Sequence, residues 1–388
     1  MASTSPEQPT KVPNSEAPEN ETPEEDLSLA SRKLAEIARA SAHASEQNRR
    51  VDVAVLDCLR AGGLGGPAIP SVAGGRRIDP ATLLRIIEIV AAGDGSAGWV
   101  TMIYATSSVA GHYLGADGLE EVFAEGPASL TSGVLAPRGT ARRVAGGYEV
   151  SGSWPFASGC VDAGWIGLGA LTEDSARLSF FFPHGEVEIL DTWDVMGLRA
   201  TASHDVVVDR RFVPERRVFD LTTQPHTREP IARIPIFGLL AAGIGAVCLG
   251  IARAAIDEAS DLAGVKVPTG SKRRLIDRPA VQEAIARAET MVAAARCYLL
   301  ALASPAPAIS MEERARLRMA ATFAVSASRE AVDLMYNAAG GTSLYSRSPL
   351  QRHFRDIHAA TQHMMVAQPT WELGAKVLLG IESDTTSL

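Results

Sequence analysis

Apolar residues recur at helical spacing in the N-terminal part of the chain, up to about residue 125. Residues 27–60 hold long stretches of Ala, Leu, Arg and Glu. Asp79 followed by Pro80 is typical of a capped helix start with proline in its first turn. A further helix is predicted from about Gly95 onward, with these side chains facing inward: Trp99, Ile103 and Val109. These patterns predict an N-terminal helical domain over residues 26–125.

The hydrophobic period then changes to two, which is the side-chain period of a β-strand. Short apolar runs separated by Gly, Pro and Asp predict strands at 129–135, 147–154, 165–171, 178–182 and 206–212. Residues 143–150 are predicted to form a hairpin whose turn is made by Gly146 and Gly147. Several short strands at this spacing favour a small β-barrel or sandwich, predicted for residues 126–228.

Helical periodicity returns in residues 229–388. Between Val281 and Leu299 the apolar positions alternate spacings of four and three, which is one stripe of a bundle helix. Gly340 and Gly341 are predicted to end the helix that begins near Met311. The whole chain is therefore predicted to have an α+β fold, with a β domain between an N-terminal helical domain and a C-terminal four-helix bundle.

The segment from Ile234 to Ala252 carries no charge and approaches the roughly 20 residues that span a bilayer. Four glycines interrupt the segment, and alanine is common in it. A bilayer rewards Gly and Ala far less than Leu and Ile. We therefore expect a helix that is buried on all sides by other helices.

The composition is that of an ordinary globular protein, with 46% apolar and 21% charged residues. A formal net charge of −8 argues against nucleic acid or an anionic membrane as a partner. Residues 1–25 are acidic, rich in proline and without the apolar core of a signal peptide, so we expect a disordered tail. Four widely spaced cysteines without metal-ligand spacing predict buried free thiols in a reducing cytoplasm: Cys58, Cys160, Cys248 and Cys297.

Four segments, in the correct order, resemble the acyl-CoA dehydrogenase family. Residues 94–99 (DGSAGW) resemble its helix start after the first connector, and residues 152–159 (GSWPFASG) resemble the strand along its flavin ring. Residues 193–203 (WDVMGLRATAS) resemble the segment that closes its β domain. The last segment includes Gly340-Gly341, Pro349 to Arg352 and Arg355-Asp356, which resemble its terminal helix pair. The resemblance implies the same α+β architecture over residues 27–375.

The chain departs from the dehydrogenases of this family near its C-terminus. Those enzymes remove a substrate proton with a glutamate that follows the Arg-Asp pair, whereas here no carboxylate follows Asp356 until Glu372. His363 occupies this region instead, as in flavin-dependent monooxygenases of the same fold. The resemblance implies the oxygenase component of a two-component system that uses O2 and reduced flavin, FMNH2 or FADH2, supplied by a separate flavin reductase. It also implies a homotetramer.

Two residues are predicted to act in catalysis. The resemblance implies that His363 lies near flavin C4a and stabilises a C4a-hydroperoxide, and a neutral imidazole can hold or pass a proton at neutral pH. The Ser158 hydroxyl would lie near flavin N5. The alternatives are a surface histidine and a serine in a turn. Arg355 and Asp356 either take part in the flavin site, pair locally or cap a helix.

Further residues are predicted to hold the flavin. Small residues at Thr131 and Ser132 would let the backbone approach the pyrimidine end of the ring. Other predicted contacts come from the motifs above: Trp154, Trp193, Thr201 and Ser203. Arg273 aligns with a family arginine that reaches the flavin phosphate from a neighbouring subunit, although a basic cluster also suits a solvated face.

The predicted substrate pocket involves Ser107 and His112. Phenol hydroxylases that resemble this chain carry a histidine at the position of Ser107, and His112 follows more than one turn later. Either His112 lines the pocket in a shifted register, or the substrate is not a simple phenol. The predicted reaction is hydroxylation of a small aromatic or polyketide-like molecule. The alternatives are N-oxygenation of an amine such as an amino sugar, an acyl-CoA dehydrogenase-type reaction, and a non-catalytic binding protein.

Overall fold

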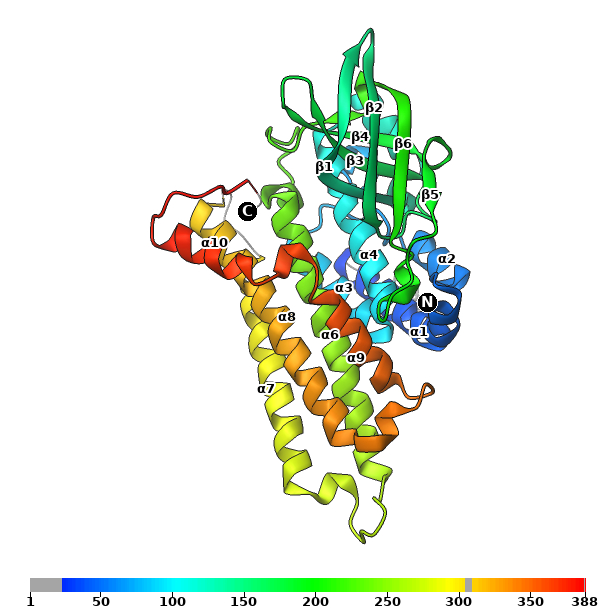
Figure 1. Ribbon diagram of the computed structural model, residues 1–388, viewed down its shortest axis with the longest axis vertical. Coiled ribbons are helices and arrows are strands. Elements are labelled where there is room, and N and C mark those ends of the chain that lie inside the picture. The colour runs from blue at the N-terminus through cyan, green and yellow to red at the C-terminus, as the bar shows by residue number, and fades with distance from the viewer. Residues whose placement is uncertain (1–22, 304–308, 387) are drawn as a thin grey trace, which may run out of the picture.

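The computed structural model describes residues 23–303, 309–386 and 388, and most of the predicted N-terminal tail lies outside these ranges (Figure 1). The helices are α1 (Pro23–Asn48), α2 (Val53–Ala61), α3 (Pro80–Gly93), α4 (Gly95–Ser107), α5 (Ala116–Val122), α6 (Ile236–Val265), α7 (Pro279–Leu302), α8 (Met311–Ala339), α9 (Pro349–Ala360) and α10 (Pro369–Leu378). The strands are β1 (Thr131–Val144), β2 (Gly147–Ala157), β3 (Trp165–Thr172), β4 (Arg177–Pro183), β5 (Glu188–Leu190), β6 (His204–Pro214) and β7 (Val218–Phe219).

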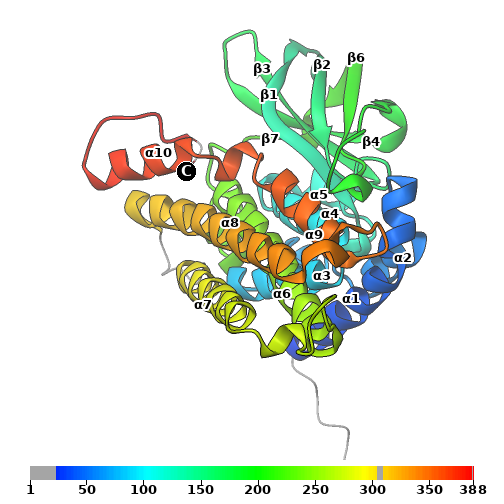
Figure 2. The same ribbon diagram turned by 60° about the horizontal axis from the view of Figure 1, so that its bottom comes forward.

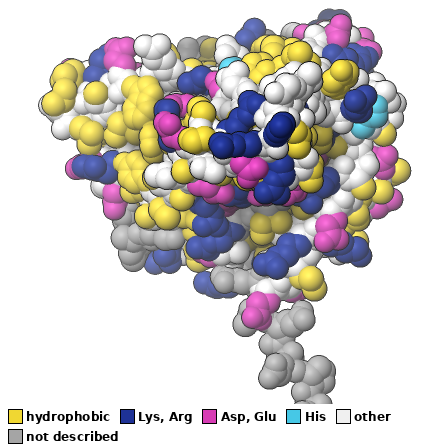
Figure 3. Space-filling view, turned by 90° about the horizontal axis from the view of Figure 1, so that it is seen from below, with side chains coloured by type: hydrophobic (Ala, Val, Ile, Leu, Met, Phe, Trp, Pro, Cys, Tyr) yellow, Lys and Arg dark blue, Asp and Glu magenta, His cyan; other side chains and the backbone are white. Residues whose placement is uncertain are grey.

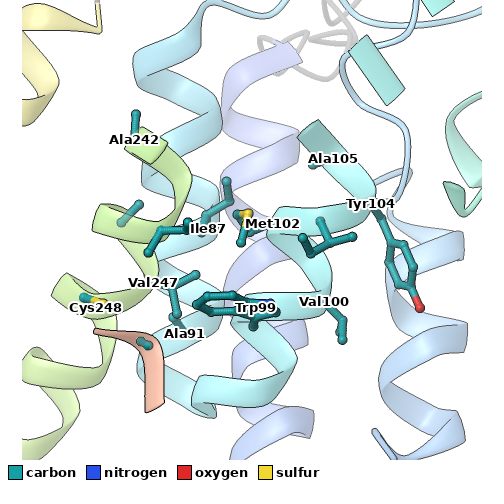
Figure 4. Close-up of a cluster of buried hydrophobic side chains, with 14 of the residues drawn as sticks. Ile87, Ala91, Trp99, Val100, Met102, Tyr104, Ala105, Ala242, Val247 and Cys248 are labelled. Atoms are coloured by element: carbon teal, nitrogen blue, oxygen red, sulfur yellow. The ribbon is translucent and has the colours of Figure 1, made fainter. Parts of the chain in front are cut away.

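Local sequence signals set the N-terminal helices. Asp79 caps α3 by accepting a hydrogen bond from the Thr82 backbone N–H, and Pro80 occupies the first turn, as predicted. Asp94 caps α4 in the same way by accepting from Ala97 N–H. On α4, Met102 faces Ala242 and Val247 of α6, whereas Tyr104 lies on the opposite side of the helix (Figure 4). Tyr104 donates to the Gly159 carbonyl oxygen at 3.0 Å, so α4 packs between the bundle and the β domain.

The seven strands form one mixed sheet in the order β5-β6-β2-β1-β3-β4-β7, with β1 and β3 parallel. The predicted hairpin joins β1 to β2, but its turn is Ala145-Gly146 and not the glycine pair. Gly146 has a φ of +81°, which favours glycine, while Gly147 already pairs with the edge of β6. A Cβ on Gly147 would lie 2.1 Å from the Val213 carbonyl oxygen, so close strand approach explains the second glycine.

The C-terminal bundle packs around α6. This helix is long and apolar enough to cross a membrane by composition, but 89% of its most apolar window is buried inside the protein. The predicted stripe on α7 faces inward, and α8 ends at Gly340, whose φ is +59°. The α4 and α9 helices lie beneath the sheet in both views of the ribbon and contact each other (Figures 1 and 2). This contact is where the sheet, the N-terminal domain and the bundle meet.

All four cysteines are free thiols, as predicted, but they are not all buried. Cys160 and Cys248 are buried, Cys58 is partly buried, and Cys297 is exposed on α7. The prediction of burial failed for Cys297 because α7 covers the core with only one stripe of its surface.

Candidate active site

Three buried hydroxyl side chains form a chain of hydrogen bonds where the end of β2 meets the segment before β6. Ser158 Oγ lies 2.7 Å from Ser203 Oγ, which lies 2.6 Å from Thr201 Oγ1. The indole N–H of Trp99, on α4, donates to Ser158 Oγ at 3.1 Å. The structure therefore brings together three of the residues predicted to form the flavin site, and we call them the hydroxyl chain (Ser158, Ser203 and Thr201).

The start of β1 adds two more buried hydroxyls. Ser132 Oγ donates to the Ser158 carbonyl oxygen at 2.6 Å. Thr131 Oγ1 is buried and has no hydrogen-bond partner among the described residues. A buried polar atom without a partner is costly unless a ligand or water supplies one. Thr131 is therefore a point where a bound polar group would fit.

His363 follows the end of α9 and lies against the same cluster. Its ring centroid is 5.8 Å from that of Trp99, at an interplanar angle of 57°. The Met365 backbone N–H donates to His363 Nδ1 at 3.2 Å, so in the neutral ring the proton is on Nε2. Burial, and then the charge of Arg318, lower the pKa of His363 to about 4. His363 is therefore neutral at neutral pH and presents one N–H donor.

The segment between β5 and β6 and the end of β2 carry exposed apolar side chains beside this cluster. Trp193 donates its indole N–H to the Leu198 carbonyl oxygen at 3.1 Å, and Phe156 packs edge-on against Trp193. Phe156 is 69% exposed and has a φ of +66°, an uncommon conformation for a bulky residue. Met196 and Met364 are also exposed. A flat apolar ligand would bury this surface.

Arg355 pairs locally, because its Nε donates to Gln351 Oε1 at 2.8 Å, but it does not pair with Asp356. Arg355 Nη1 donates to the Met196 carbonyl oxygen at 2.7 Å, and Asp356 Oδ1 accepts from the Leu198 N–H at 2.6 Å. The two residues therefore attach α9 to the loop that precedes the hydroxyl chain. The sequence motif gives the pair but not this target, because the loop lies more than 150 residues away.

Two predicted site residues lie elsewhere. Trp154 is fully buried in the sheet, and its indole N–H donates to the Gly169 carbonyl oxygen at 2.7 Å. His112 is also fully buried, and both ring nitrogens have partners, Thr227 Oγ1 and the Ala68 carbonyl oxygen. A side chain with no exposed surface and satisfied polar atoms offers nothing to a ligand. We therefore assign Trp154 and His112 to the core.

The substrate-pocket role of Ser107 and the phosphate-binding role of Arg273 remain predictions. Ser107 is partly buried at the end of α4, eight residues beyond Trp99. Arg273 is exposed in the connection between α6 and α7, at the far end of the bundle from the sheet. Lys and Arg side chains gather on that end, seen from below in Figure 3. One chain alone does not bring Arg273 to the hydroxyl chain.

Trp99 is the site residue whose role the sequence did not reveal. It was expected only as an inward apolar residue, but it joins Ser158 to His363. A buried indole N–H usually finds an acceptor, so a polar neighbour could have been expected. Which residue accepts this hydrogen bond depends on how α4 packs against the sheet.

A surface cleft of about 650 Å³ lies outside this cluster, between α2, α5 and the start of β3. It is lined by Arg50, Arg60, Val122, Ala124, Glu125, Ser129, Leu130, Val161, Asp162, Ala163, Gly164, Trp165 and His184. Arg50 and Asp162 pair with each other across it. We place the active site at the hydroxyl chain because the unpartnered hydroxyl and the neutral imidazole are there. Among the described residues, no group of three or more His, Cys, Asp or Glu side chains could hold a metal ion.

Comparisons with known proteins show the family of the chain. Residues 242–368 match the acyl-CoA dehydrogenase C-terminal domain. The chain is 30% identical to an indole-3-acetate monooxygenase of Pseudomonas putida, over 86% of this chain and 89% of that protein. The chain belongs to the flavin-dependent monooxygenases of the acyl-CoA dehydrogenase fold.

Two further comparisons concern the cofactor of these monooxygenases. The chain is 29% identical to the oxygenase component of an FADH2-dependent resorcinol hydroxylase of Rhizobium sp., covering 90% of this chain and 93% of the relative. The structure of XiaF from Streptomyces sp., in complex with FADH2 and glycerol, superposes with a TM-score of 0.87 and 26% identity, covering 94% of this chain and 98% of that one. The monooxygenase is therefore an oxidoreductase that uses reduced flavin and O2, with a separate flavin reductase and a small-molecule substrate.

Proposed function

We propose that this monooxygenase hydroxylates a small aromatic molecule beside the hydroxyl chain. The observation that carries the proposal is the convergence of His363, Trp99 and Ser158 from three separate parts of the fold. The relatives named for indole-3-acetate and resorcinol support an aromatic substrate. Two exposed apolar side chains suit a flat, apolar molecule: Phe156, two residues before Ser158, and Met364, next to His363.

The residues present fit a flavin. Thr131 Oγ1 is a buried hydroxyl without a hydrogen-bond partner among the described residues. The polar edge of a flavin ring would supply that partner. Ser158, Thr201 and Ser203 would lie along the ring and the ribityl chain, and Trp193 would cover an apolar part of it. When bound and reduced, the flavin supplies the electrons that activate O2 for transfer of one oxygen atom to the substrate.

The protein's own residues would control protons and exclude water. His363 Nε2–H would donate a hydrogen bond to an oxygen atom near the flavin without changing the protonation state of the imidazole ring, because the pKa of His363 lies near 4. Trp99 holds Ser158 by donating to its hydroxyl oxygen. Side chains packed around α4 keep the cluster buried, which slows unproductive loss of activated oxygen to water.

The position of Glu372 disfavours a dehydrogenase reaction. It is the first carboxylate after Asp356 in the sequence and lies exposed on α10, where it pairs with Lys376 at 2.7 Å. A base that removes a substrate proton over the flavin would have to lie at the buried cluster.

We further propose a cytoplasmic homotetramer. Exposed apolar side chains on the bundle and the C-terminal helix support association, among them Tyr298, Phe323, Trp371 and Leu379. In such an assembly Arg273 of one subunit would reach the flavin phosphate of another. The four free thiols suit a reducing compartment.

The experiment uses isotopically labelled O2. The protein, chemically reduced FMN or FAD and a panel of indole-3-acetate, indole and resorcinol are mixed in single turnovers, and the products are analysed by mass spectrometry. We expect at least one member to gain one labelled oxygen atom. If all of the O2 becomes hydrogen peroxide with every panel member, and an acyl-CoA thioester reduces the bound oxidised flavin, the proposal fails.

A further inference from the structure

Asp356 is a buried carboxylate that accepts a backbone hydrogen bond from the 193–198 loop. It is 2% exposed, and its Oδ1 accepts from the Leu198 N–H at 2.6 Å. The backbones approach closely here, since a Cβ on Gly197 would lie 2.1 Å from the Arg355 carbonyl oxygen. Leu198 has a φ of +52°, so this contact holds a non-glycine residue in the left-handed region.

The other side of Leu198 fixes the hydroxyl chain. Its carbonyl oxygen accepts from the Thr201 hydroxyl at 2.9 Å and from the Trp193 indole N–H at 3.1 Å. The N–H and the carbonyl of one residue therefore link α9, through Asp356, to the residues predicted to hold the flavin. Asp356 touches none of them directly in the hydrogen bonds described.

The Leu198 carbonyl also sets the direction of every hydroxyl hydrogen in the chain. A carbonyl oxygen only accepts, so the Thr201 hydroxyl donates to Leu198 and must accept from Ser203. Ser203 has one hydrogen, so it must accept from Ser158. Ser158 therefore donates into the chain, accepts from Trp99, and keeps one lone pair for a ligand.

This direction distinguishes the two oxidation states of a flavin. N5 of a reduced flavin carries a hydrogen and donates, whereas N5 of an oxidised flavin has a lone pair and accepts. A lone pair on Ser158 suits only the reduced form. We propose that Asp356 is a positioning residue that fixes the Leu198 peptide, and through it the direction of the hydroxyl chain, so that the site favours reduced over oxidised flavin.

The inference rests on the proposed flavin site, and its test measures binding and not turnover. Dissociation constants for oxidised and for anaerobically reduced FMN and FAD are measured for the parent and for Asp356→Ala. We expect the preference for reduced flavin to fall about tenfold in Asp356→Ala, the size expected for one misdirected hydrogen bond. Asp356→Asn keeps an oxygen acceptor for Leu198 N–H and is expected to stay within about twofold of the parent.

Asp333→Ala is the matched control. Asp333, on α8, is a carboxylate that binds Arg329 of the same helix and His358 of α9. It makes no contact with the path from Asp356 to Leu198 in these ion pairs. It should keep the parental preference even where it lowers stability. The inference is overturned if Asp356→Ala keeps the preference, if Asp356→Asn loses it equally, or if Asp333→Ala loses it too. A parent protein that binds neither form would instead contradict the proposed function.

Discussion

Replacing His363 by alanine is expected to lower the rate of product formation by about 100-fold, the lower end of the effect of removing one positioned hydrogen-bond donor. O2 should still be consumed, because the flavin supplies the electrons and alanine removes only the Nε2–H donor. The lost product should appear as hydrogen peroxide. The measurement is the ratio of hydroxylated product to peroxide in single turnovers with reduced flavin and a panel member that the parent hydroxylates.

His358→Ala provides the control for this variant. His358 lies in the last turn of α9, five residues before His363, but it binds Asp333 and packs against Phe354, so the variant should hydroxylate at close to the parental rate. Equal losses in the two variants would show that the end of α9 matters only as a scaffold. A His363→Ala protein with the parental product ratio would remove the assignment of this residue altogether.

Trp154→Ala is expected to lower the free energy of unfolding by about 3–5 kcal/mol, as for other large aromatic residues removed from a core. The Trp154 ring packs closely against two glycines, because a Cβ on Gly139 or Gly152 would lie 2.3 Å or 2.6 Å from its atoms. The protein that remains folded should bind reduced flavin with unchanged affinity. Denaturant unfolding and flavin titration measure the two quantities separately.

Trp193→Ala should show the reverse pattern. Its ring is only partly buried and packs against the exposed Phe156, so its loss should cost little stability but weaken flavin binding. If Trp154→Ala instead kept its stability and lost flavin affinity, the tryptophan would belong to the flavin site, as the sequence motif first suggested.

Local patterns predicted most of the fold. Asp79 and Pro80 identified the start of α3, and Gly340 identified the end of α8, because caps and stops depend on a few neighbouring residues. The stripe on α7 followed from helical spacing alone. The hairpin between β1 and β2 was predicted, although its turn lies one residue earlier. These features need no knowledge of distant contacts.

The site was only partly predictable because its contacts span the chain. The motifs marked Ser158, Thr201, Ser203 and His363, and the structure places all four around Trp99 or beside one another. Motif membership could not separate Trp193 at the loop from Trp154 in the core, since strand position alone does not tell which face is covered.

The core position of His112 was not predictable from its sequence neighbours, for a related reason. Its two ring nitrogens are satisfied by Ala68 and Thr227, 44 and 115 residues away in the sequence. No local pattern shows that a histidine has such partners. The same distance in sequence hid the contact between Asp356 and Leu198.

We propose that the cluster of His363, Trp99 and Ser158 holds a reduced flavin and controls its reaction with O2. The most direct test mixes the protein, loaded with chemically reduced FMN or FAD, with O2 in the absence of substrate, and follows the absorbance of oxidised flavin. We expect this absorbance to return after a lag and far more slowly than for free flavin. We also expect His363→Ala to shorten the lag. Return at the rate of free flavin, with or without His363, would contradict it.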